Sequence, residues 1–232
     1  MDNHSAGGDE KTAGDVLIRR ILSAAVLSPV VLAAVYYGFP YFDLLAAAAA
    51  MTMLMEWKRL VRPGGGAILL IIGVLYIILP MAGLVWLRAD AEWGRATMFW
   101  LFALVWSADT GAYAFGRIIG GPKLAPGISP NKTWAGMAGA VLCAAAAGAV
   151  AAYIIQAGTD IFLLALFSAF LGAVDQAGDL LESAFKRHFG VKDTGRLIPG
   201  HGGLLDRADG LLAVVGVTAL ISLAGKGNIL SW

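Results

Sequence analysis

The sequence has a single cysteine and few charged residues. Of its 232 residues, 14% are charged and 59% are hydrophobic, whereas a soluble globular domain has about 25% charged and about 45–50% apolar residues. Cys143 lies within the apolar stretch AVLCAAAAGAV. A disulfide framework and a cysteine-based metal site are therefore both excluded, and we interpret Cys143 as a small packing residue. The net charge of +1 gives no reason to expect a nucleic-acid partner.

Long hydrophobic runs are abundant instead. A helix needs about 20 residues to cross a bilayer. Seven segments are apolar over comparable lengths: 18–38, 41–57, 67–87, 96–118, 134–156, 160–185 and 208–224. We expect an all-α polytopic membrane protein with about seven transmembrane helices and cytoplasmic polar loops. Pro80 could divide the third segment, so eight or nine helices are the alternative.

The distribution of basic residues predicts a topology. Residues 1–16 are polar and mixed in charge, and we interpret them as a tail. Arg19 and Arg20 precede an apolar run, as in a secretory signal, but the many later segments favour an uncleaved first helix. We place the N-terminal tail in the cytoplasm and count seven spans. In that topology 14 of the 17 Lys and Arg residues fall on the cytoplasmic side, as the positive-inside rule requires.

Small residues recur in segment 134–156. The stretch GMAGA, residues 136–140, has small residues four apart. Such residues let membrane helices approach each other closely. Helix packing explains this pattern without any further function.

The segment 160–185 carries a polar stripe that continues just beyond its end. Its members are Asp175, Asp179, Glu182, Ser183 and Lys186. Steps of three or four residues place them on one helix face. A charge at a membrane centre costs about 2.5–3.5 kcal/mol even on an insertion scale, so the stripe must face protein, water or a bound cation. Acids followed by Lys186 and Arg187 indicate a site for a metal and an anion together; a helix end already in solvent is the alternative.

A glycine-rich stretch, PGHGGLLDRADG, precedes the last apolar segment. Glycines such as Gly202 and Gly203 permit a ligand to approach the backbone closely. Asp206 beside Arg207 fits Mg²⁺ next to a phosphate, because Mg²⁺ takes one or two carboxylates and completes its shell with water and phosphates. Asp209 is equally well explained as a helix cap.

Segment 96–118 and the loop after it also contain polar candidates. Asp109 lies well inside the segment, and an intramembrane acid is a functional candidate by default. In ISPNKTWAG, Lys132 and Thr133 stand just before the next helix. A helix N-terminus attracts anions, so this turn is a candidate phosphate cradle, although it lacks the GxxxxGK[ST] spacing of a P-loop.

Together these residues resemble a family signature. It comprises Ser183, Phe185, Lys186 and Arg187, then Lys192, Asp193 and Gly195, then IPGHGGLLDRAD at 198–209. This pattern is similar to that of the phosphatidate cytidylyltransferases, or CDP-diacylglycerol synthases. The stretches DTGAYAFGR, KLAPGISPNKTWAG and GDLLES also resemble the family, in its order, so the resemblance covers about residues 107–210. Ala135, Asp175 and Ala208 depart from the pattern, and no role is carried over to them.

The resemblance implies a reaction and a set of site residues. The reaction is CTP plus phosphatidic acid giving CDP-diacylglycerol and pyrophosphate. We expect Mg²⁺ at Asp179 and Asp206, with K⁺ as a candidate second cation. The expected catalytic residues are Asp179, Asp206, Lys186, Arg207 and His201. The expected substrate-binding residues are Asp109, Ser129, Lys132, Thr133, Ser183, Arg187, Lys192, Gly202 and Gly203. For His201, contact with a phosphate and a backbone hydrogen bond are equal alternatives.

The same reasoning predicts the organisation of the chain. We expect a tail at 1–16, membrane helices at 17–106, a catalytic membrane region at 107–225 and a C-terminal tail at 226–232. The expected partners are CTP, phosphatidic acid and the lipid bilayer. The resemblance suggests a homodimer. The short N-terminus without a targeting peptide favours a bacterial inner membrane with the site facing the cytoplasm.

Other functions fit the sequence less well. A secondary transporter would place its binding groups near the midplane in two related halves, and no second copy is found. A polyprenol or phytol kinase would suit a membrane nucleotide site but lacks the full signature from Ser183 to Asp209. A CDP-alcohol phosphotransferase would show a different acid-rich pattern. A scaffold role leaves Asp109 and Asp179 unexplained.

Overall fold

The computed structural model describes residues 25–61, 66–155, 160–195 and 202–231. Its elements are α2 (Tyr41–Val61), α3 (Ala67–Ala89), α4 (Gly94–Ile118), β1 (Lys123–Ala125), β2 (Ser129–Thr133), α5 (Trp134–Ile155), α6 (Ile161–His188), α7 (Leu205–Ala224) and the short 3₁₀ helix η1 (Ile229–Ser231). A further apolar helix, Ala25–Tyr37, precedes α2. The expected tail at 1–16 and His201 lie outside the described residues.

The helices match the apolar segments of the sequence. Each of the seven segments is helical over most of its described part. Within the described ranges, four helices, α3, α5, α6 and α7, are long and apolar enough to cross a membrane. The protein is therefore an all-α membrane protein, and the expected count of seven or more spans stays a prediction.

Helix α3 is continuous, so the division that Pro80 could have caused does not occur. The helix runs from Ala67 to Ala89 with Pro80 buried inside it. Pro80 packs against Gly216 of α7, where a Cβ atom would lie 3.4 Å from the proline ring. The neighbouring helix α7 leaves room for the proline ring, so Pro80 does not divide α3 into two shorter spans.

Helices α4, α5 and α6 pack through small residues. A Cβ atom on Gly139 of α5 would lie 2.5 Å from the carbonyl oxygen of Gly111 in α4. A Cβ atom on Gly172 of α6 would lie 2.7 Å from that of Ala144 in α5. Cys143 also lies against Gly111 and is half-buried. The packing interpretations of GMAGA and of Cys143 are thus confirmed, since backbones approach where side chains are absent.

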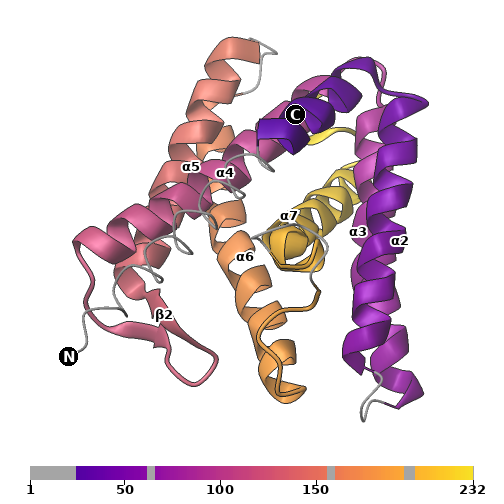
Figure 1. Cartoon of the computed structure of the whole chain (residues 1–232). Helices are drawn as coiled ribbons and strands as arrows, with labels where there is room; N and C mark the ends of the chain where they lie inside the picture. The colour runs from indigo at the N-terminus through magenta and orange to yellow at the C-terminus, as the bar shows by residue number, and fades with distance from the viewer. Residues whose placement is uncertain (1–24, 62–65, 156–159, 196–201, 232) are drawn as a thin grey trace, which may run out of the picture.

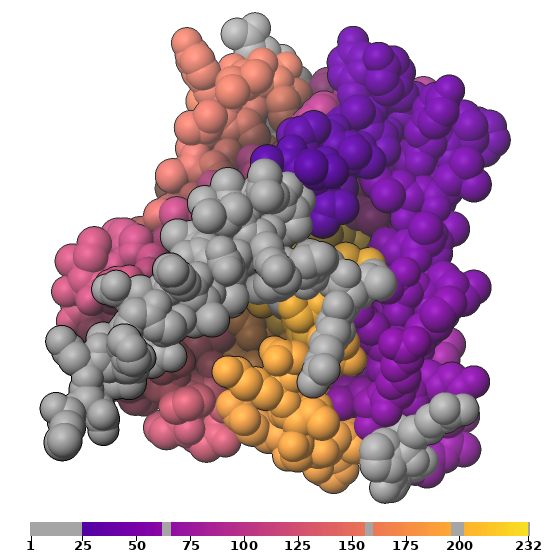
Figure 2. Space-filling view, in the orientation of Figure 1, coloured from indigo at the N-terminus to yellow at the C-terminus, as the bar shows by residue number. Residues whose placement is uncertain are grey.

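Helix α7 occupies the middle of the molecule. Figure 1 shows it passing between α6 on one side and the α2–α3 pair on the other, and it contacts α3 and α6 extensively. Its apolar residues Leu212, Val214 and Val215 are buried. In Figure 2, which has the orientation of Figure 1, the purple atoms of α2 and α3 form one side of the molecule. Residues at the start of α7 are therefore positioned by both halves of the chain.

A short β-hairpin stands where the sequence predicted a turn. Strands β1 and β2 pair antiparallel, with Lys123 opposite Thr133. The strands are too short for their alternation to be visible in the sequence. In Figure 1 the hairpin and the C-terminal end of α6 lie at one end of the molecule, and the C-terminus lies at the other.

Candidate active site

Lys186 joins the polar stripe of α6 to the first turn of α7. Its ammonium nitrogen lies 2.5 Å from Glu182 Oε2 and 3.0 Å from Asp206 Oδ1. The side chains of Glu182 and Asp206 are 1% and 3% exposed. One lysine thus pairs with two buried acids from two helices. Buried charges need such partners because their transfer out of water is costly.

Asp206 is held by backbone amides as well as by Lys186. Its Oδ2 accepts the N–H of Gly203 at 2.8 Å. The N–H of Thr194 lies 3.1 Å from Oδ1 and 3.0 Å from Oδ2. The two loop ends on either side of residues 196–201 therefore converge on this carboxylate. Asp206 is a fixed anchor for the start of α7.

A second lysine connects the hairpin to α6. Lys132 Nζ in β2 lies 2.7 Å from Asp179 Oδ2 and donates to Gln176 Oε1 at 2.8 Å. Gln176 Nε2 in turn donates to Asp175 Oδ2 at 3.0 Å. Ser183 Oγ donates to Asp179 Oδ1 at 3.3 Å. The fold therefore brings Lys132, expected to bind a phosphate, beside the acids of α6.

Further carboxylates lie between these two lysines. Asp209 lies close to both Asp179 and Glu182, and Glu182 lies close to Asp206. The Oδ1 of Asp175 and the Oε1 of Glu182 are buried and have no hydrogen-bond partner among the described residues. Of the two acids expected to hold Mg²⁺, Asp179 pairs with Lys132 and Asp206 pairs with Lys186.

Arg207 and Asp109 extend the site to α4. The charges of Lys132 and Arg207 lie close enough to act on the Asp109 carboxylate, as does Asp179. Asp109 is exposed on α4 rather than enclosed by the helices. The structure therefore brings Asp109, which the sequence singled out as an intramembrane acid, to the open edge of the same group.

Other predicted residues have structural partners within the protein. Arg187 Nε donates to the carbonyl oxygen of Ile128 at 3.2 Å and ties the hairpin turn to α6. Thr133 Oγ1 accepts the N–H of Gly136 at 3.0 Å and caps α5. Ser129 begins β2 and Lys192 is exposed after α6. Their contacts with substrate stay predictions.

The two glycines expected to approach a ligand also serve the local fold. Gly202 has φ +90°, which favours glycine. The N–H of Gly203 donates to Asp206. A Cβ atom on Gly203 would lie 2.8 Å from Glu56 Oε2. Close packing and a left-handed turn account for both glycines, and contact with a substrate stays a prediction for them.

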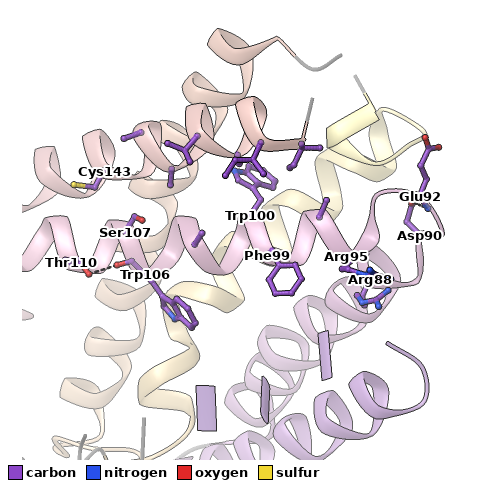
Figure 3. A pocket seen from close by; sticks show the side chains of 18 of the residues that line it. Arg88, Asp90, Glu92, Arg95, Phe99, Trp100, Trp106, Ser107, Thr110 and Cys143 are labelled. Carbon is purple, nitrogen blue, oxygen red and sulfur yellow. Dashed lines mark hydrogen bonds between the residues drawn. The ribbon is translucent and has the colours of Figure 1, made fainter. Parts of the chain in front are cut away.

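A large cavity lies elsewhere, along α4 and α5. It has a volume of about 1310 Å³. Arg88, Asp90, Glu92 and Arg95 lie at one end, and Ser107, Thr110 and Cys143 at the other (Figure 3). None of the predicted site residues that the structure describes lines it. The acid–lysine group therefore does not form the lining of this cavity.

Comparisons with known proteins show the family of this chain. A model of the family described as the cytidylyltransferase family matches residues 65–224. Phosphatidate cytidylyltransferase of Brucella suis is 39% identical over an alignment of 254 positions, gaps included, that covers 89% of this chain and 92% of that protein. Phosphatidate cytidylyltransferase of Staphylococcus haemolyticus is 45% identical over 133 residues, covering 57% of this chain and 51% of that protein. The chain belongs to the cytidylyltransferase family.

In this cytidylyltransferase the structure adds two residues that the sequence analysis did not select. Tyr76 of α3 donates its hydroxyl to the carbonyl oxygen of Asp209 at 3.3 Å. Glu56 of α2 accepts hydrogen bonds from the first turn of α7. Both come from the N-terminal helices and reach partners more than 130 residues away. No local spacing in the sequence could have connected them to the site.

Proposed function

We propose that this protein transfers the cytidylyl group of CTP to phosphatidic acid and releases pyrophosphate, forming CDP-diacylglycerol. Membership of the cytidylyltransferase family supports this reaction, as do relatives named phosphatidate cytidylyltransferase. The observation that carries the proposal is the convergence of Lys132, Lys186 and several acids where the hairpin meets the ends of apolar helices. At such a place a nucleotide from water can meet a lipid headgroup.

The chemistry needs charge neutralisation more than it needs a base. An oxygen of the lipid phosphate forms a bond to the α-phosphorus of CTP. The bond from that phosphorus to the bridging oxygen breaks, and this oxygen leaves with pyrophosphate. Both reactants are anionic, so positioning and electrostatic stabilisation lower the barrier. Lys132, Lys186 and Arg207 supply positive charge around the reacting phosphates, and Arg187 and Lys192 extend it toward water.

The acids proposed to hold a metal offer hard carboxylate oxygens, the kind of ligand that Mg²⁺ prefers. Among the described residues no three His, Cys, Asp or Glu side chains are arranged to hold a metal by themselves. Carboxylates are nevertheless crowded, and the orphaned oxygens of Asp175 and Glu182 are hard ligands of the kind Mg²⁺ prefers. We propose that Asp179 and Asp206 hold Mg²⁺, with water and phosphate oxygens completing its shell. The ion would contribute positive charge to the triphosphate; K⁺ is the candidate second cation.

The membrane arrangement follows the basic residues. We propose seven membrane helices, with residues 107–225 forming the catalytic region and the site facing the cytoplasm of a bacterial inner membrane. The hairpin and the end of α6 carry many basic residues, such as Lys123, Lys132 and Arg187, which favours a cytoplasmic location. The relatives above are bacterial proteins. A homodimer stays a prediction.

Transfer of label from CTP to lipid tests the reaction. Purified protein receives phosphatidic acid and CTP labelled in the cytosine ring, with and without Mg²⁺. We expect Mg²⁺-dependent label in the chloroform-soluble fraction. Asp179→Asn and Asp206→Asn each remove a carboxylate from the site and should lower the rate about 100-fold or more.

The controls separate this reaction from its alternatives. Asp43→Asn makes the same chemical change in the first turn of α2 and should leave the rate within about twofold of the unmodified protein. Lipid labelled from the γ-phosphate and not from the ring would indicate a kinase. Folded protein that binds no CTP and labels no lipid would rule out the enzyme.

A further inference from the structure

Glu56 is a buried acid outside the group described above. It lies near the C-terminal end of α2 and is 3% exposed. Among the described residues no lysine, arginine or histidine forms an ion pair with it. A buried carboxylate without compensation is costly. The buried charge of Glu56 must therefore be stabilised by groups other than basic side chains.

The first turn of α7 supplies that compensation. Glu56 Oε1 accepts the N–H of Leu204 at 3.0 Å, and Oε2 accepts the N–H of Leu205 at 2.8 Å. The first amides of a helix have no partner within the helix, and the helix dipole places positive charge there. Both oxygens of one carboxylate thus cap a helix that begins 149 residues later in the sequence.

Two glycines make this contact possible. A Cβ atom on Gly195 would lie 2.6 Å from Glu56 Oε1, and one on Gly203 would lie 2.8 Å from Oε2. The same backbone also holds Asp206. The N–H of Thr194, which precedes Gly195, and the N–H of Gly203 both donate to the Asp206 carboxylate. Glu56 and Asp206 therefore contact the same two backbone segments, at residues 194–195 and 203–205.

From this geometry we infer that Glu56 is a positioning residue that fixes the backbone at 203–205 and thereby the place of Asp206. It acts through the backbone and does not contact the reacting atoms. Glu56 lies outside residues 65–224, which the family model matches, and the kinetic part of this inference rests on the proposed function.

Hydrogen exchange tests the backbone role without any substrate. Glu56→Gln keeps the size of the side chain but removes its charge and replaces one acceptor with a donor. We expect amides in peptides covering residues 202–207 to exchange about tenfold faster, while α4 and α5 keep their protection. Glu92→Gln is the matched control, because Glu92 is exposed in the connection before α4. Unchanged exchange at 202–207, or an equal rise in every helix, would overturn the inference.

Kinetics test the consequence for Asp206. Glu56→Gln should lower kcat about 10- to 100-fold, since small displacements of a catalytic group have effects of this size, with KM for phosphatidic acid within about twofold of the unmodified value. Glu56→Asp retains the charge and should recover part of kcat. A Glu56→Gln protein with normal kcat, or one altered in KM alone, contradicts the inference. Unmodified protein without activity would count against the proposed function, and the exchange result would still decide the role of Glu56.

Discussion

At the scale of single residues, the most consequential side chain is Lys186. It serves Glu182 and Asp206 together, and both acids are almost fully buried. Removing one partner of a buried ion pair leaves an uncompensated charge, which costs more than the pair itself contributes. The loss of stability caused by replacing Lys186 should therefore depend on whether residue 182 carries a charge.

Lys186→Met should destabilise the protein by about 3 kcal/mol, because Glu182 and Asp206 lose their shared cation. The double variant Lys186→Met, Glu182→Gln should regain more than half of that stability, since the amide needs no counter-charge. Thermal unfolding in detergent measures both. A double variant no more stable than Lys186→Met would show that Glu182 does not depend on Lys186.

The sequence predicted such residues when their partners were local. The stripe from Asp175 to Lys186 follows from helical spacing alone, and the fold confirms that it faces other polar groups. Glu56 was missed because its partners, Leu204 and Leu205, lie on another helix and contribute only backbone amides. Every residue except proline has a backbone N–H, so the residue types at 204 and 205 do not indicate that they bind a carboxylate. Only the fold could reveal this contact.

At the scale of elements, the close contact of α4 with α5 depends on glycine. Gly139 faces the carbonyl oxygen of Gly111 and the side chain of Phe115. A backbone oxygen cannot move aside as the end of a flexible side chain can. The two helices must therefore separate if a methyl group is added between them.

Gly139→Ala should destabilise the protein by about 1–3 kcal/mol through this overpacking. Cys143 lies one turn further along α5 and against Gly111, so its thiol should react faster with a small maleimide when the helices separate. Gly66→Ala is the control, because a Cβ atom there meets nothing within 4 Å. Equal stability and equal thiol reactivity in the two variants would contradict the packing argument.

The elements show where prediction from sequence succeeds and where it stops. The seven apolar segments were predicted because hydrophobic runs are local, and the helices follow them. Division of the third segment at Pro80 was only the alternative, and α3 continues through this residue because Gly216 of α7 leaves room for the ring. The β-hairpin was read as a turn because strands of three and five residues give too short an alternation to recognise.

At the scale of the whole molecule, the site depends on both halves of the chain. Lys132, Lys186 and Asp206 come from the region that resembles the family signature. Glu56 and Tyr76, from α2 and α3, contact α7 at residues 204, 205 and 209. The N-terminal helices therefore do more than anchor the protein in a bilayer, because they fix the helix that carries Asp206.

The orientation of the molecule can be tested through its two ends. In Figure 1 the hairpin and the C-terminus lie at opposite ends, so Lys123 and Lys226 should lie on opposite sides of the membrane. Starting from a Cys143→Ser protein, which has no thiol, Lys123→Cys or Lys226→Cys introduces a single reporter. The positive-inside rule predicts that a membrane-impermeant maleimide labels position 226 in intact spheroplasts and position 123 only in inverted vesicles. The reverse pattern would place the acids and lysines of the site outside the cytoplasm, away from CTP, and labelling of both positions from one side would exclude an odd number of spans between them.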